Sequence, residues 1–169
     1  MRFNLVDRIV EVEPGRLLRA VKNLTLGEEY LADHFPGFPV MPGVLMLHTL
    51  AEAGAWLLRL TDDFRHSVIV LREARNVKYG SFMEPGKRLE VTAELVEQND
   101  GPDGLLATFK GKGEREGVLT VSAKFTLARY NLADRDPALR ETDQRLVNHL
   151  RGLYAVLHND RDPALARSC

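Results

Sequence analysis

The stretch that decides the fold is "HFPGFPVMPGVLMLHTLAE", residues 34–52, in which three prolines and two Pro-Gly steps are followed by an apolar run. Each proline fixes its own φ and disfavours helix at the residue before it, so residues 34–41 are expected to form an irregular loop. Pro42 can occupy the first position of a helix. The stretch therefore predicts a fixed loop that leads into a helix from about Pro42 to Leu60.

The apolar residues of this predicted helix lie on nearly all of its sides, which is typical of a helix covered from several directions. They are Val44, Leu45, Leu47, Leu50, Ala51, Ala55, Trp56, Leu57 and Leu58. The run is nearly long enough to cross a membrane, but it carries His48, Glu52 and Arg59, and each charge at bilayer depth costs about 2.5 to 3.5 kcal/mol. We therefore expect a buried helix of a globular core and no membrane insertion.

Segments of strand character surround the helix in the sequence. They alternate apolar and polar residues or are enriched in β-branched residues, and they cover residues 5–13, 16–25, 66–79, 88–98, 105–114 and 118–130. The turns between the last three segments are too short for helical crossovers, so the sheet is predicted to be antiparallel. The sequence thus predicts an α+β domain, residues 1–130, in which a curved antiparallel sheet wraps one long helix.

Residues 131–169 change in character and are predicted to form a helical C-terminal extension. Asp136-Pro137 and Asp162-Pro163 are typical of helix starts, with Asp as the cap and Pro at the first position. A stripe of apolar residues at helical spacing lies between them. It consists of Leu146, Leu150, Leu153, Tyr154 and Leu157.

Composition excludes several classes of function. The chain has 169 residues and a net charge of -1, so it lacks the basic field of a nucleic-acid-binding protein. Its one cysteine, Cys169, cannot form an intramolecular disulfide and supports no cysteine metal site. The first residues, "MRFNLVDRIVEVEPG", lack the cationic head and apolar stretch of a signal peptide, so a cytoplasmic protein is expected.

His34 and Gly43 are the first candidate pair for chemistry. The loop places the His34 imidazole just ahead of a helix whose first amides, including that of Gly43, lack intrahelical partners. Such an arrangement suits proton abstraction beside a polarised carbonyl, because a residue without Cβ lets a carbonyl approach the backbone closely. The alternative is that His34 only hydrogen-bonds within a tight loop and Gly43 fills a turn.

His48 and Glu52 form the second pair, four residues apart on one face of the helix. They are either a hydrogen-bonded pair that faces a subunit contact or an acid and base that project into a cavity. A metal site of His34, His48 and Glu52 is poorly supported, since the spacing matches no compact ligand signature. A local basic rim could also attract an acidic partner, or be only a solvated strand face. Its members are Arg72, Arg75, Lys78, Lys87 and Arg88.

The segment "HFPGFPVMPGVLM" closely resembles the signature of the bacterial 3-hydroxyacyl-acyl-carrier-protein dehydratases, members of the hotdog-fold superfamily. The likeness extends upstream to "LVDRIVEVEPG" and more loosely downstream to about Tyr130. It implies a hotdog fold, no cofactor, and a substrate carried on acyl carrier protein. It also implies a homodimer with active sites at the subunit interface, often assembled into a hexamer as a trimer of dimers.

The resemblance also implies roles for the candidate residues. His34 matches the histidine that removes a proton from C2 of the 3-hydroxyacyl thioester, and Gly43 matches the glycine whose amide binds the thioester carbonyl. The family's second catalytic residue is a Glu or Asp of the partner's helix, and at that position this chain has His48. The glutamine usually found one turn later is Glu52 here.

Three hypotheses follow. In the first, the chain is a dehydratase of fatty-acid or related acyl-chain biosynthesis. His34 is then the base, and either protonated His48 or Glu52 activates the departing hydroxyl. We favour His48 as the proton donor, with Glu52 orienting it and favouring its charged form. In the second, it is a hotdog thioesterase in which Glu52 is the base or nucleophile. In the third, it is a non-catalytic subunit that binds acyl chains or acyl carrier protein.

Overall fold

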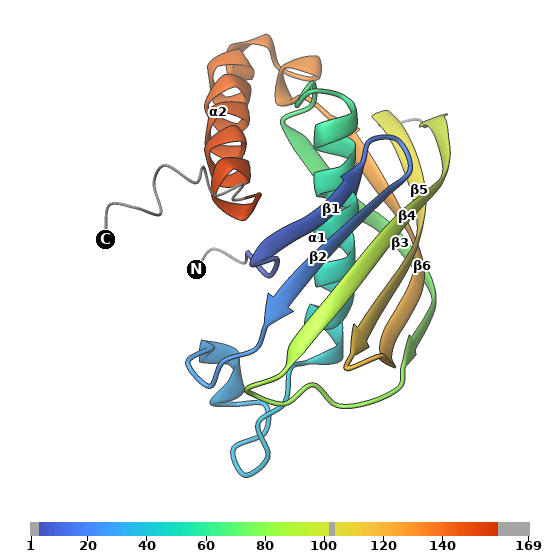
Figure 1. The fold of residues 1–169 in the computed structure, drawn as a ribbon. Helices are drawn as coiled ribbons and strands as arrows, with labels where there is room; N and C mark the ends of the chain where they lie inside the picture. The colour runs from blue at the N-terminus through green and yellow to red at the C-terminus, as the bar shows by residue number, and fades with distance from the viewer. Residues whose placement is uncertain (1–3, 102–103, 159–169) are drawn as a thin grey trace, which may run out of the picture.

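A computed structural model describes residues 4–101 and 104–158, and most of them form a single antiparallel sheet around one long helix (Figure 1). The strand order is β1-β2-β4-β5-β6-β3, and every neighbouring pair is antiparallel. The strands are β1 (Arg8–Glu13), β2 (Leu17–Asn23), β3 (Val68–Tyr79), β4 (Arg88–Gly101), β5 (Gly104–Arg115) and β6 (Val118–Tyr130). The predicted α+β class and the antiparallel sheet are confirmed.

The long helix α1 (Gly43–Thr61) lies across the concave face of the sheet. Its inward side chains pack on two stacked phenylalanines of the sheet, Phe109 and Phe125, whose ring centroids are 5.3 Å apart. At Gly54 the helix approaches so closely that a Cβ atom would lie 3.0 Å from the Phe125 ring. Pro42 is the N-cap residue, directly before the first helical residue, Gly43. The predicted helix, from about Pro42 to Leu60, is therefore correct to one residue at each end.

Strand β3 lies at one edge of the sheet, and within residues 4–101 and 104–158 it pairs only with β6. Most of its residues are exposed, including Val70 and Leu71, which are 44% and 41% exposed. The other edge of β3 therefore presents unpaired backbone amides and carbonyls beside apolar side chains, which is the usual condition of a strand that pairs with a second chain.

The C-terminal residues form η2 (Leu132–Asp134), η3 (Pro137–Leu139) and α2 (Arg140–Leu157). Asp136 caps η3 as predicted, because its Oδ1 accepts a hydrogen bond of 3.0 Å from the Ala138 amide. The helix start predicted at Asp162-Pro163 lies outside the described residues. None of the described helices is long and apolar enough to cross a membrane.

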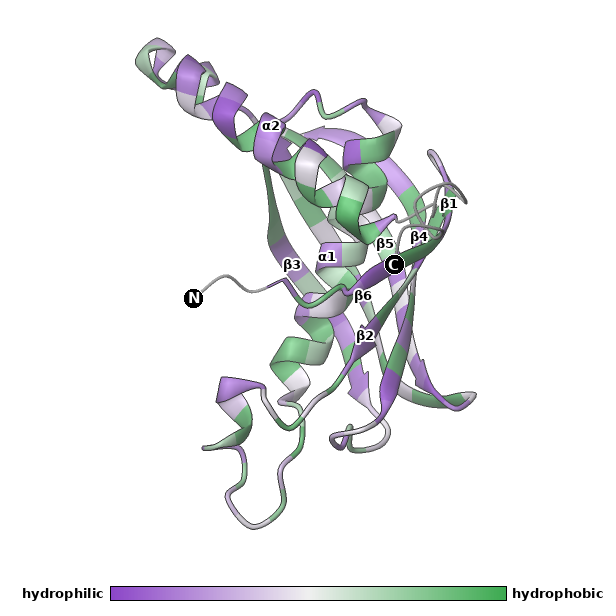
Figure 2. Cartoon of the chain, turned by 60° about the vertical axis from the view of Figure 1, so that its left-hand side comes forward, coloured by the Kyte–Doolittle hydropathy of each residue, from purple (hydrophilic) through white to green (hydrophobic). Residues whose placement is uncertain are grey.

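Helix α2 packs against the side of α1 that the sheet leaves open (Figures 1 and 2). Apolar and polar residues alternate along it, and Leu150, Leu153, Tyr154 and Leu157 of the predicted stripe contact the core. The Tyr154 ring lies 6.3 Å from that of Trp56 on α1. These residues of the stripe therefore attach the extension to the rest of the chain by apolar contacts.

Candidate active site

The loop before α1 is closed by its own backbone hydrogen bonds. The amide of Phe38 donates to the Phe35 carbonyl at 2.9 Å, and the amide of Val40 donates to the His34 carbonyl at 3.0 Å. Past the loop, the Met41 amide donates to the Met83 carbonyl at 2.8 Å, which ties the chain to the segment between β3 and β4. The prolines thus give a loop of fixed shape, as the sequence predicts.

This loop holds the His34 ring in one orientation. Its Nδ1 lies 2.9 Å from the Val40 carbonyl oxygen. A carbonyl can only accept, so Nδ1 carries the proton and Nε2 keeps its lone pair in the neutral ring. The half-buried ring is also stacked on Phe35, with centroids 4.2 Å apart. In this tautomer Nε2 is the ring atom that can accept a proton or a hydrogen bond.

Gly43 lies beside His34 on the wall of an apolar cavity of about 610 Å³. Its amide is the first of α1, and no hydrogen bond among residues 4–101 and 104–158 uses it. A Cβ atom here would lie 2.9 Å from the ring of Tyr79, so glycine is required for packing as well as for access to the amide. Tyr79 and Phe82 also line this cavity, and sequence reasoning did not single them out.

His48 and Glu52 line a different cavity, of about 280 Å³, which shares no lining residue with the first. Helical geometry explains the separation. Each residue turns the helix by about 100°, so His48 points about 140° away from the direction of Gly43. The structure therefore brings His34 and Gly43 together, and His48 and Glu52 together, but it keeps the two pairs apart within one chain.

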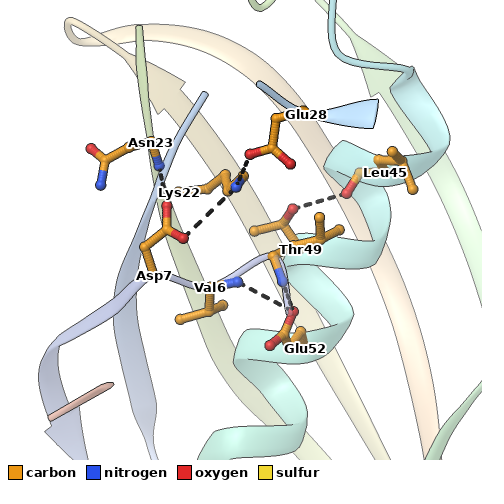
Figure 3. Close-up of polar contacts among 9 residues, drawn as sticks. Val6, Asp7, Lys22, Asn23, Glu28, Leu45, Thr49 and Glu52 are labelled. Atoms are coloured by element: carbon orange, nitrogen blue, oxygen red, sulfur yellow. Dashed lines mark hydrogen bonds and ion pairs between the residues drawn. The ribbon is translucent and has the colours of Figure 1, made fainter. Parts of the chain in front are cut away.

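The Glu52 carboxylate is held by the N-terminal segment (Figure 3). Its Oε2 accepts hydrogen bonds from the amides of Leu5, at 2.8 Å, and Val6, at 3.3 Å. The residues 5–7, predicted as part of a strand, instead cross α1, and β1 begins only at Arg8. The indole N–H of Trp56 faces the same carboxylate without a hydrogen bond of ordinary geometry.

Burial raises the pKa of Glu52, and the hydrogen bonds from Leu5 and Val6 oppose this effect only in part. Burial lowers the pKa of His48, and no other group counteracts it. A hydrogen bond between the two side chains is not found in the described part of the chain. Among the described residues, burial is the one cause that shifts the pKa of His48, and Oε2 of Glu52 accepts its hydrogen bonds from backbone amides. The proposed orientation of His48 by Glu52 stays a prediction.

Arg59 also lines the His48 cavity, a position that the sequence did not single out for chemistry. Burial lowers the pKa of Arg59 to about 10, so the guanidinium stays charged at neutral pH. It lies over the Trp56 ring, 5.2 Å from the centroid. Arg59 thus adds a cation to the polar groups of this cavity and partly balances the charge of Glu52.

The predicted basic rim is largely neutralised by neighbouring carboxylates. Arg75 contacts Glu73 at 2.7 Å, and Lys87 contacts Glu116 at 3.0 Å. Arg88 is paired with Glu90. The alternative interpretation, a solvated strand face with local ion pairs, fits these three residues better.

No group of three His, Cys, Asp or Glu side chains in residues 4–101 and 104–158 is placed to hold a metal ion.

The chain was compared with known protein families, sequences and structures. Residues 1–124 match the family model of the FabA-like domain. The 3-hydroxyacyl-[acyl-carrier-protein] dehydratase FabZ of Ligilactobacillus salivarius is 39% identical over 118 residues, which cover 69% of this chain and 84% of that protein. FabZ of Albidiferax ferrireducens is 38% identical over 135 residues, covering 78% and 87%. FabZ of Wolbachia pipientis is 39% identical over 93 residues, and this chain spans 65% of its length.

Solved structures show the same fold at low sequence identity. The dehydratase heterocomplex ApeI:P from Xenorhabdus doucetiae has a TM-score of 0.61 at 14% identity and covers 80% of this chain and 89% of its own. The PaaI protein of Escherichia coli has a TM-score of 0.54 at 10% identity, covering 72% and 82%. The fold predicted from the resemblance is confirmed, and with the FabZ relatives and the match over residues 1–124 these findings show that the chain belongs to the FabA-like family of hotdog proteins.

Proposed function

We propose that the chain dehydrates 3-hydroxyacyl thioesters, carried on acyl carrier protein, to trans-2-enoyl thioesters in fatty-acid or related acyl-chain biosynthesis. The observation that carries this proposal is the pairing of His34 and Gly43 in one apolar cavity. The imidazole offers a free Nε2, and the helix offers an unused amide beside it. FabZ relatives at 38–39% identity are named for the same activity.

The proposed reaction removes water across C2 and C3. His34 Nε2 takes a proton from C2, and the Gly43 amide donates a hydrogen bond to the thioester oxygen, on which negative charge develops. The electron pair left on C2 forms the double bond to C3 as the C3 hydroxyl departs. His48 gives that hydroxyl a proton, so that water leaves and the enoyl thioester remains.

We further propose that His48 comes from a partner subunit of a homodimer, which can assemble further into a hexamer. Within one chain His48 and His34 line separate cavities, so one chain cannot present both to the same substrate. The unpaired edge of β3 and its exposed apolar residues provide the surface for a second copy. The dimer completes the site by bringing the two cavities together.

One observation favours the alternative function, a non-catalytic subunit that binds acyl chains or acyl carrier protein. Burial lowers the pKa of His48, so less of the imidazole is protonated at neutral pH than in an exposed histidine. A hydrolase based on Glu52 has less support, because two backbone amides occupy one oxygen of its carboxylate.

One assay separates these functions. The purified protein is incubated with 3-hydroxyacyl and saturated acyl thioesters on acyl carrier protein, and enoyl product and free acid are measured together. We expect enoyl product, and we expect His34→Ala to lower its rate about 10²- to 10⁴-fold. His149→Ala, an exposed histidine of α2, is the matched control and should have no effect. Free acid that disappears with Glu52→Gln would point to the hydrolase, and the absence of both products would point to the binding subunit.

A further inference from the structure

The cavity that holds His48 has a wall supplied by the C-terminal extension. Leu150 and Leu153 of α2 line it, together with Ile69 and Leu71 of β3. The FabA-like family match ends at residue 124, before α2 begins. This wall therefore belongs to the part of the chain that the family domain does not include.

Helix α2 is fixed in place near both of its ends. Near the start, the buried Asp143 carboxylate accepts hydrogen bonds from the Ser67 hydroxyl and from the amides of Leu132 at 3.0 Å and Ala133 at 2.9 Å. Near the end, Leu157 is only 4% exposed.

The middle of α2 is also attached to the core domain. Arg151 contacts the Asp63 carboxylate at 2.9 Å and lies over the Phe64 ring at 4.6 Å. Since α2 is attached near its start, in its middle and near its end, the positions of Leu150 and Leu153 in the cavity wall are fixed.

We propose that Leu150 and Leu153 set the length of acyl chain that the enzyme accepts. This inference rests on the proposed dehydratase function. His48 acts at the C3 hydroxyl, so the carbons beyond C3 enter the cavity that His48 lines. They pass Ala51 and Ala55 of α1, whose small side chains leave room, and stop at the two leucines of α2.

The small volume of the cavity predicts that the accepted acyl chains are short. Within one chain its volume of about 280 Å³ lies just below the range for small-molecule sites, roughly 300 to 1,000 Å³. Each CH₂ that is buried favours binding by about fourfold, so kcat/KM should rise with each carbon that fits and fall once the chain reaches α2.

The test measures kcat/KM for straight-chain 3-hydroxyacyl thioesters that grow in steps of two carbons. We expect Leu153→Ala and Leu150→Ala to move the optimum to a longer chain, with a gain of about tenfold for the substrate one step beyond the parent's optimum. Leu153→Phe should move it to a shorter chain. Val156→Ala, at a 70% exposed position of the same helix, is the matched control and should leave the length profile unchanged.

The outcomes separate this inference from the proposed function. If the parent protein dehydrates no substrate of the series, the dehydratase function itself fails. If the parent is active but Leu153→Ala and Leu153→Phe change all chain lengths by one common factor, α2 does not set the length. Thermal unfolding of each variant shows whether it is folded, and the enlarging Leu153→Phe substitution keeps the test decisive if an alanine variant unfolds.

Discussion

Two histidines of the same stretch are given different properties by their surroundings. The Val40 carbonyl fixes the tautomer of His34 and leaves Nε2 free. His48 is half-buried, and no hydrogen bond in the described ranges 4–101 and 104–158 involves its ring. A base needs a free lone pair, and an acid needs a proton, so only His34 is fully prepared for its proposed role within one chain.

The first prediction concerns pH. If protonated His48 is the acid, kcat must fall as pH rises through its pKa, and burial places that pKa below the ordinary value of 6.5. His48→Gln should lower kcat about 10²-fold at acidic pH and remove this descending limb. His34→Ala is a separate comparison, because it removes the base and should lower kcat at every pH. A descending limb that persists in His48→Gln would show that another group supplies the proton.

The second prediction concerns Glu52 and stability. Its pKa is raised in the folded protein, so the parent's free energy of unfolding falls as pH rises from about 4.5 through the raised value. Glu52→Gln has no carboxyl to ionise, and its amide oxygen can still accept hydrogen bonds from Leu5 and Val6. The free energy of unfolding of this variant, relative to that of the parent, should therefore increase as pH rises from about 4.5 through the raised pKa. Glu52→Ala leaves both amides unpaired and should cost about 1 to 3 kcal/mol.

Urea denaturation of the parent and both variants, below pH 4.5 and at neutral pH, measures these differences. The second prediction is wrong if the stability difference between Glu52→Gln and the parent is the same at both pH values.

At the scale of elements, α2 depends on one buried carboxylate. Burial acts to raise the pKa of Asp143, but the hydrogen bonds from Ser67, Ala133 and Leu132 together outweigh it and lower the pKa below the usual value. The lowered pKa means that Asp143 stabilises the folded chain above about pH 3.8 and that this contribution is lost as pH falls.

The third prediction follows from these contacts. Asp143→Ala should lower the free energy of unfolding at neutral pH by about 2 to 3 kcal/mol, because buried donors lose their acceptor. Hydrogen exchange should become faster across residues 140–157. Glu141→Ala, which removes an exposed carboxylate from the same first turn of α2, is the control and should cost less than about 1 kcal/mol. Unchanged exchange in Asp143→Ala would mean that the apolar stripe alone holds the helix.

At the scale of the whole molecule, each chain carries two separate cavities, which the proposed function assigns to one shared site. One is formed by the loop and first turn of α1, and the other by the His48 turn with its cover of β3 and α2. In the proposed symmetric dimer, the loop of each chain meets the His48 turn of its partner, so that one contact gives two complete sites.

The fourth prediction tests this arrangement by mixing two inactive variants. His34→Ala and His48→Gln are combined in equal amounts under conditions that exchange subunits. Half of the dimers are then mixed, and each mixed dimer has one intact site, so activity should return to about a quarter of the parent's. No recovery, with exchange verified by differently tagged subunits, would mean that the site is not shared between chains.

The sequence by itself determined the long helix, the antiparallel sheet and the fixed loop, because proline geometry and apolar periodicity are local properties. It also singled out His34, Gly43, His48 and Glu52, by residue type, spacing and resemblance.

Only the tertiary structure decided which of these residues meet. The rotation of α1 between Gly43 and His48 separates the two pairs, and the amides of Leu5 and Val6 take the carboxylate that the sequence assigned to His48. The leucines of α2 reach the His48 cavity from about a hundred residues away in the chain. Such contacts depend on how distant segments pack, and no local pattern in the sequence records them.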